Sequence, residues 1–107
     1  MDRLQLTQAD NGGAFEVSAG GVIVVSLEEN AITGYRWAIA QLDSEVVSLQ
    51  AAVSKSPSGL GVGGGSTRTF TFEAKRVGDT VLSLKQWRDW EGESSVIQRY
   101  AVAVKIR

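Results

Sequence analysis

The stretch "RTFTFEA", residues Arg68–Ala74, alternates between polar and apolar side chains. Phe70, Phe72 and Ala74 fall on one side of an extended chain, and two threonines and a glutamate fall on the other. Successive side chains of a β-strand point to opposite faces, so a period of two predicts a strand here. The aromatic side of this strand is expected to face a core.

Further strand signals lie on both sides of this stretch. The run "VIVVSL" (Val22–Leu27) is almost continuously apolar and rich in β-branched residues, as expected for a strand covered on both faces. Alternating patterns occupy residues 15–18, 80–87 and 99–107, and another apolar run starts at Trp37, which is assigned to the core. The other core residues expected from these patterns are Phe15, Val17, Leu82, Leu84, Tyr100, Val102, Val104 and Ile106.

Turn signals separate the strands. Residues 10–13 ("DNGG"), 19–21 ("AGG") and 76–79 ("RVGD") contain Gly or Asn, which tolerate a positive φ. Several short strands with turns at this spacing predict an all-β sandwich or barrel.

One segment has two interpretations. Residues 43–55 ("DSEVVSLQAAVSK") contain no Gly or Pro and fit a helix with Ser44 as its N-cap. The same residues also alternate, with Val47, Leu49, Ala51 and Val53 on one side. We favour a strand, because a lone helix would interrupt an otherwise all-β pattern.

Length and composition indicate one globular domain, residues 1–107. Hydrophobic residues make up 43% of the chain and charged residues 21%, with a net charge of −1 and no clustering of Lys or Arg. This pattern gives no electrostatic reason to expect nucleic acid or an anionic membrane as a partner. No apolar stretch approaches the roughly 20 residues of a membrane span.

The inventory of reactive side chains is short. The chain has no Cys and no His, which excludes disulfides, Cys-based zinc sites and every nucleophile–His arrangement. The start "MDRLQLTQ" has no apolar leader. The compartment stays open: the chain as it stands is expected to be soluble and cytoplasmic, or periplasmic or secreted if a leader has been removed.

Candidate sites for catalysis are weak. The Gly-rich stretch 56–66 ("SPSGLGVGGGS") lacks the Lys of a phosphate-binding loop and is followed by a strand, not a helix. Asp89, Glu91 and Glu93 alternate in "RDWEGE", but nothing predicts the apolar pocket that an acid catalyst needs, and the spacing is not that of a Ca²⁺ loop. Trp and Arg are enriched in interface hot spots, so Trp87, Arg88 and Trp90 favour binding over catalysis.

Three loop segments together resemble the chagasin family of cysteine-peptidase inhibitors. In "NAITGYRW" (30–37), residues Asn30, Thr33, Gly34, Tyr35 and Trp37 match the family motif N-P-T-T-G-[YF]-x-W. In "LGVGGGS" (60–66) three glycines match G-x-G-G, and in "RDWEG" (88–92) an Arg and a Trp match R-P-[WF]. The first motif is specific and the other two are weak alone, but their order and spacing cover essentially the whole chain.

The sequence departs from the family pattern at two loops. Ala31 and Ile32 replace the usual Pro and Thr, and Asp89 replaces the Pro of the third motif. A proline reduces the freedom of an unbound loop, so its loss implies more entropy lost on docking. These departures support an alternative function, a non-inhibitory immunoglobulin-like module for binding or adhesion.

The resemblance implies an immunoglobulin-like β-sandwich of about seven or eight strands with three loops side by side at one end. It implies a reversible, competitive inhibitor whose loops enter the cleft of papain-like cysteine peptidases, as a monomer and without a cofactor or metal. The residues expected to contact the peptidase are Asn30, Ile32, Thr33, Gly34, Tyr35, Gly61, Val62, Gly63, Gly64, Arg88, Asp89 and Trp90.

Within this set, Gly34 is expected at an exposed tip, where the missing Cβ lets the main chain approach a catalytic centre. Thr33 is expected to offer a hydroxyl at the tip. Trp90 is expected to bury its ring against the enzyme, while Arg88 either bonds the enzyme or braces its own loop. Tyr35 fits both a place beside the loop and a place in the core.

Overall fold

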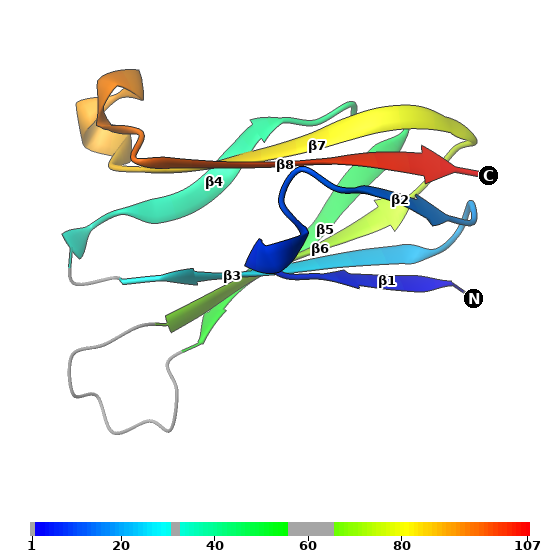
Figure 1. Cartoon of the computed structure of the whole chain (residues 1–107), viewed down its shortest axis with the longest axis horizontal. Coiled ribbons are helices and arrows are strands. Elements are labelled where there is room, and N and C mark those ends of the chain that lie inside the picture. The colour runs from blue at the N-terminus through cyan, green and yellow to red at the C-terminus, as the bar shows by residue number, and fades with distance from the viewer. Residues whose placement is uncertain (1, 31–32, 56–65) are drawn as a thin grey trace.

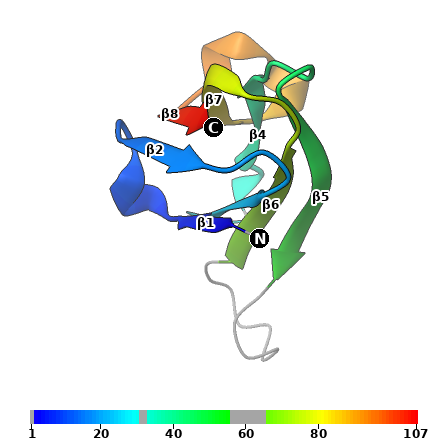
Figure 2. The same ribbon diagram turned by 90° about the vertical axis from the view of Figure 1, so that its right-hand side faces the viewer.

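The computed structural model describes residues 2–30, 33–55 and 66–107. These residues form two four-stranded sheets packed face to face as separate layers (Figures 1 and 2). The first sheet has the order β1 (Arg3–Leu6), β3 (Val22–Glu29), β6 (Ser66–Ala74), β5 (Val47–Lys55). The second sheet has the order β2 (Ala14–Val17), β8 (Gln98–Ile106), β7 (Gly78–Trp87), β4 (Arg36–Gln41).

Three short 3-10 helices complete the described elements: η1 (Gln8–Asp10), η3 (Asp89–Glu91) and η4 (Glu93–Ser95). The prediction of an all-β sandwich is therefore confirmed, and the eight strands agree with the expected number.

The core lies between the two sheets and follows the sequence alternation closely. Phe70, Phe72 and Ala74 of β6 face alternating residues of β8, all at 2% exposure or less. Trp37 is buried as expected, at 1%. Of the residues expected in the core, Phe15 alone is only partly buried and packs against the edge of the cluster. In β3, Ile23, Val24 and Val25 are all buried, in agreement with the prediction of a strand covered on both faces.

The N-terminal segment contributes an edge strand to each sheet. β1 pairs in parallel with β3, and β2 pairs in parallel with β8, its partner near the other end of the chain. Between them, η1 is held by the Tyr100 hydroxyl, which donates to the Thr7 carbonyl at 3.0 Å. Burial raises the pKa of Tyr100 to about 12. The strand β1 is absent from the sequence prediction, because four residues with two leucines are too short to show a period.

The segment 43–55 is a strand over Val47–Lys55, as favoured, but its predicted face is wrong. Val47 and Leu49 pair opposite Ala74 and Phe72 of β6, on the core side of the sheet. A register shift between Leu49 and Ala51 then moves Ala51 and Val53 to the other face. Val53 is 49% exposed, and Leu49 is 41% exposed although it lies opposite Phe72, so β5 is largely exposed beyond Val47. A bulge of this kind cannot be read from an alternating pattern alone.

The strands place three connections at the same end of the sandwich, on the left in Figure 1. These are the β3–β4 connection, the β7–β8 connection that contains η3 and η4, and the pair of strand ends Lys55 and Ser66 that bound residues 56–65. Ser66, the first residue of β6, pairs with Glu29, so the start of β6 lies beside the start of the β3–β4 connection.

Candidate functional site

The first loop, residues 30–35, turns tightly at its described residues. The backbone N–H and the hydroxyl of Thr33 both donate to the Asn30 carbonyl, at 3.2 and 2.8 Å. Gly34 follows with a φ of +79°, a conformation that side chains with a Cβ rarely adopt. The Thr33 hydroxyl therefore donates within the loop instead of projecting freely from a tip.

The third loop, residues 88–92, is closed by hydrogen bonds between its backbone and the side chain of Ser95. The Ser95 hydroxyl has two acceptors for its one hydrogen within reach, the carbonyls of Gly92 at 2.6 Å and Arg88 at 2.9 Å, and it accepts the Arg88 N–H at 3.0 Å. Glu93 then joins the loop to both neighbouring strands, through Lys85 of β7 at 2.8 Å and Arg99 of β8 at 3.2 Å. The hydrogen bond from Lys85 is the main cause that lowers the pKa of Glu93.

Arg88 connects the third loop to the first. Its Nε donates to the Thr33 carbonyl at 3.0 Å, and its guanidinium lies 4.2 Å from the centre of the Tyr35 ring. Its Nη1 pairs with Glu91 of its own loop at 3.3 Å. Arg88 is expected either to bond the enzyme or to brace its own loop, and these contacts within the molecule fit the second role. Tyr35 lies half-buried beside the loop and not in the core.

Trp90 lies against Gly34. A Cβ built on Gly34 would come within 2.5 Å of the Trp90 ring, which no real side chain tolerates. The expectation that Gly34 sits at an exposed tip is therefore wrong, since the tryptophan half covers it. Trp90 itself remains 68% exposed, so one part of its ring packs on the glycine and the rest faces solvent.

A hollow of about 350 Å³ lies where the two loops meet the ends of β4, β6 and β7. Trp87 lies at its edge, half-buried and outside the core, with the Lys85 ammonium 3.7 Å from the centre of its ring. Asp89 and Arg36 are exposed beside it. The residues that line the hollow are Gly34, Arg36, Trp37, Ala38, Arg68, Trp87, Asp89 and Trp90.

Part of the expected contact set lies outside the described residues. This holds for Ile32 and for the glycine loop with Gly61, Val62, Gly63 and Gly64. The strand ends that bound the glycine loop do lie at the loop-bearing end, since Lys55 pairs with Thr67 and Ser66 with Glu29. Of the expected residues, the structure brings together Asn30, Thr33, Gly34, Tyr35, Arg88, Asp89 and Trp90.

Two supporting residues are missing from the sequence prediction. Ser95 is 9% exposed and Glu29 is 4% exposed, and both bond to the backbone at the base of a loop. Neither belongs to a motif, and each acquires its role only through a partner fixed by the fold.

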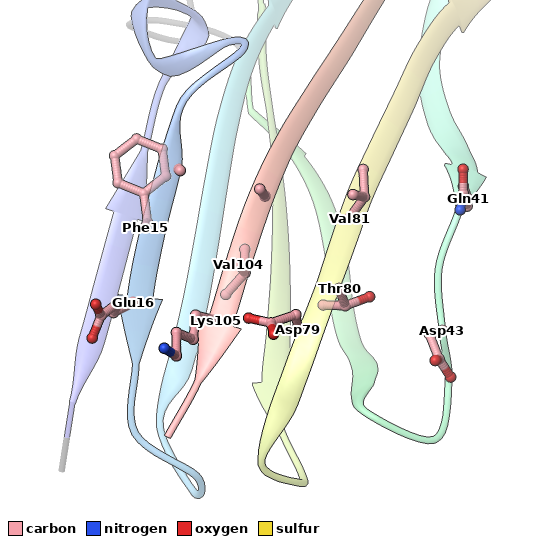
Figure 3. Close-up of a pocket in the computed structure, with 11 residues that line it drawn as sticks. Phe15, Glu16, Gln41, Asp43, Asp79, Thr80, Val81, Val104 and Lys105 are labelled. Carbon is pink, nitrogen blue, oxygen red and sulfur yellow. The ribbon is translucent and has the colours of Figure 1, made fainter.

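A larger hollow, of about 650 Å³, lies on the outer face of the second sheet at the opposite end (Figure 3). Its floor contains Val81, and at one end Lys105 of β8 lies between Glu16 of β2 and Asp79 of β7. Across residues 2–30, 33–55 and 66–107, no group of His, Cys, Asp and Glu side chains is arranged to hold a metal ion. The same residues include no helix long and apolar enough to cross a membrane.

Comparison with known proteins gives one consistent result. Chagasin from Trypanosoma cruzi is 28% identical over 105 residues, which cover 94% of this chain and 96% of that protein. The crystal structure of the cysteine protease inhibitor EhICP2 from Entamoeba histolytica superposes with a TM-score of 0.86 at 29% identity, over 98% of this chain and 96% of that one. The structure of PbICP-C in complex with falcipain-2 shares the fold, with a TM-score of 0.61 at 17% identity over 99% of this chain and 90% of that one.

The family model agrees with these neighbours. Residues 16–104 match the family described as Chagasin family peptidase inhibitor I42. The matched range contains β3 to β7 in full, the second half of β2 and most of β8, and it leaves out β1. The names of the family and of these relatives describe inhibitors and not enzymes. This chain belongs to the chagasin family of peptidase inhibitors.

Proposed function

We propose that this protein is a reversible, competitive inhibitor of papain-like cysteine peptidases and that its loop-bearing end fills the active-site cleft. The observation that carries this proposal is the joint between two loops, in which Arg88 bonds to Thr33 and Trp90 packs on Gly34. The joint turns two separate connections into one projecting edge. The structure of PbICP-C in complex with falcipain-2, which shares this fold, and the structure of EhICP2, named as a cysteine protease inhibitor, support the choice of partner.

The first loop is suited to meet a catalytic cysteine without being cut. Its backbone is fixed by two hydrogen bonds to the Asn30 carbonyl and by the positive φ of Gly34. Glycine lets the main chain come close to the enzyme, and the fixed turn keeps the peptide bonds out of the extended form of a substrate. The chain has no cysteine, so it cannot form a disulfide with the catalytic cysteine of the enzyme, and we propose that the complex is held by non-covalent contacts and is reversible.

Trp90 is expected to supply much of the binding energy. It is a large exposed aromatic residue, 68% accessible, on a braced loop. Trp is among the residues that dominate interface hot spots, because it buries a large rigid surface at a small entropic cost. The remaining contacts are assigned to Asn30, Ile32, Thr33, Gly34, Tyr35, Asp89 and the glycine loop. A standard interface would bury about 800 Å² on each partner.

A titration tests the proposal. The protein is added to a fixed amount of papain with a fluorogenic peptide, and activity is measured at several substrate concentrations. Loss of activity that is stoichiometric at high enzyme concentration and is relieved by more substrate is expected. Full activity of several papain-like peptidases at micromolar protein would contradict inhibition and favour the non-inhibitory binding module.

A further inference from the structure

Glu29 is a buried carboxylate that the joint between the first and third loops does not use. It is the last residue of β3, immediately before the first loop, and its side chain has no exposed area. Burying a carboxylate is costly unless hydrogen bonds and a cation compensate for the lost water. A charge at this position therefore needs an explanation beyond the filling of space.

The carboxylate of Glu29 is bonded to two other strands, β4 and β5. Its Oε2 accepts the backbone N–H of Trp37 at 2.9 Å. Its Oε1 accepts the Ser54 hydroxyl at 3.3 Å and lies 3.7 Å from Nε of Arg36. These contacts join the end of β3 to the start of β4, which belongs to the other sheet, and to the end of β5.

Ser54 is the second node of this cluster. Its hydroxyl accepts from Arg36 at 3.1 Å and from Arg68 at 2.9 Å while it donates to Glu29. Arg68, near the start of β6, also donates from Nε to the Trp37 carbonyl at 3.1 Å. We call Glu29, Arg36, Ser54 and Arg68 the base cluster.

The base cluster contacts the two ends of the first loop and both strands that lead into residues 56–65. Glu29 precedes the first loop and Arg36 follows it. Ser54 is one residue from the end of β5, and the Ser66 hydroxyl at the start of β6 donates to the Glu29 carbonyl at 3.4 Å. The buried Glu29 therefore contacts residues that flank both the first loop and residues 56–65.

We propose that Glu29 and Ser54 are positioning residues for inhibition, which fix the first loop relative to the last residues of β5 and the first residues of β6. The inference rests on the proposed function for its effect on peptidases, but not for its effect on the loops themselves. A hydrophobic replacement of a buried ionic group often leaves a fold equally stable, so stability alone does not explain the charge. Directional bonds from four strands restrict the loop bases in a way that apolar packing does not.

Ser54→Ala is the direct test. Ser54 is exposed as a whole residue, so its truncation leaves no cavity, yet it breaks the links to Glu29, Arg36 and Arg68. Ser48→Ala is the matched control, because it makes the same change on the same strand toward the opposite end. The Ser48 hydroxyl also accepts a hydrogen bond, from Gln50 at 2.8 Å. Ser54→Thr keeps the hydroxyl and is the rescue variant.

Three measurements separate positioning from stability: the inhibition constant for papain, the thermal midpoint, and amide hydrogen exchange of residues 33–35 and 66–68. For Ser54→Ala we expect an inhibition constant about 5- to 10-fold higher, faster exchange in both segments and an unchanged thermal midpoint. Ser48→Ala and Ser54→Thr should match the wild type within about twofold.

Equal behaviour of Ser54→Ala and Ser48→Ala in inhibition and exchange would overturn the proposal. So would a fall of the thermal midpoint that accounts for the whole effect, because the role would then be structural. If the wild type itself fails to inhibit papain, the proposed function is wrong. In that case, faster exchange of Ser54→Ala confined to the two segments would still support the positioning role of the base cluster. Unchanged exchange in this variant would overturn that role.

Discussion

The two ends of the sandwich are closed in different ways. At the end that carries both termini, backbone groups bond to backbone groups: Gly20 donates to the Ala74 carbonyl at 2.7 Å and Arg107 to the Val17 carbonyl at 3.0 Å. At the loop-bearing end, side chains do most of this work, through Arg88, Trp90, Ser95 and Glu29.

The difference has a consequence for substitutions. A turn closed by its backbone tolerates most side chains, whereas a loop fixed by particular side chains loses its shape when one of them changes. Changes at the terminal end are therefore expected to act on stability alone. Changes at the loop-bearing end are expected to act on inhibition.

The strongest test of this contrast is Gly34→Glu, set against Gly20→Glu. Both glycines have a positive φ, +79° and +89°, so both substitutions carry similar backbone strain, of about 1–2 kcal/mol. At Gly34 the new Cβ also collides with Trp90, while at Gly20 there is open space. We expect inhibition of papain to be lost in the first variant and retained in the second, with similar losses in thermal midpoint. Normal inhibition by Gly34→Glu would show that the first loop is not in the cleft.

Trp90→Ala should have the next largest effect. Removal of a hot-spot tryptophan costs about 2 kcal/mol or more, which raises the inhibition constant about 30-fold. The ring is 68% exposed, so the thermal midpoint should change little. Val77→Ala is the control at the terminal end, where Val77 is 72% exposed and no effect on inhibition is expected. An unchanged inhibition constant for Trp90→Ala would remove this residue from the interface.

Arg88→Lys tests the joint between the loops. A lysine cannot donate to Thr33, pair with Glu91 and lie flat over Tyr35 at once, because its charge is a single point. We expect the inhibition constant to rise about 5- to 10-fold, as for the loss of a charged hydrogen bond in a positioned loop. Arg107→Lys is the matched control, since Arg107 forms exposed ion pairs with Asp2 and Glu16. Equal effects of the two changes would mean that the joint adds nothing to inhibition.

The smallest effect is expected from pH, through Asp2 at the terminal end. Hydrogen bonds from Ser18 lower the pKa of Asp2 below its ordinary value of 3.8. A group whose pKa is lower in the folded state stabilises the fold above its unfolded pKa, and this contribution is lost as pH falls through the folded value. Asp2→Asn should therefore lower the thermal midpoint slightly at pH 7, and this difference from the wild type should shrink in acid, at pH values well below 3.8. The same difference at both pH values would contradict the assignment, and inhibition at pH 7 should be unaffected.

Much of the fold could be predicted because its signals are local. The alternation in β6 and β8 identifies their buried faces, and the burial of Phe72 and Val102 agrees with it. The face of β5 could not be predicted beyond Leu49, because the bulge depends on how this strand meets β6. β1 pairs with β3, but its four residues show no hydrophobic period from which a strand could be predicted.

The candidate site could be predicted as a set of loops but not as a joint. The motifs include Gly34, Arg88 and Trp90. Nothing in the sequence shows that the Trp90 ring covers Gly34, or that Arg88 forms its hydrogen bonds within the molecule. Glu29 and Ser95 could not be found from the sequence, because a charge at a strand end and a serine in a loop are normally solvated. The role of Glu29 depends on Trp37 and Ser54 in other strands, and that of Ser95 depends on the turn that brings Arg88 and Gly92 to its hydroxyl.

The parallel pairing of β2 with β8 also has a consequence for how the chain folds. Ala14 lies opposite Ala103 and Val17 opposite Ile106, so β2 can join the second sheet only after β8, far later in the chain, has been made. Such distant pairings close large loops and slow the search for the native topology, as in other β-sandwiches that fold in milliseconds to seconds. During synthesis, residues 14–17 are made long before their partner strand, and a chain that ends before β8 would leave both β7 and β2 without this neighbour.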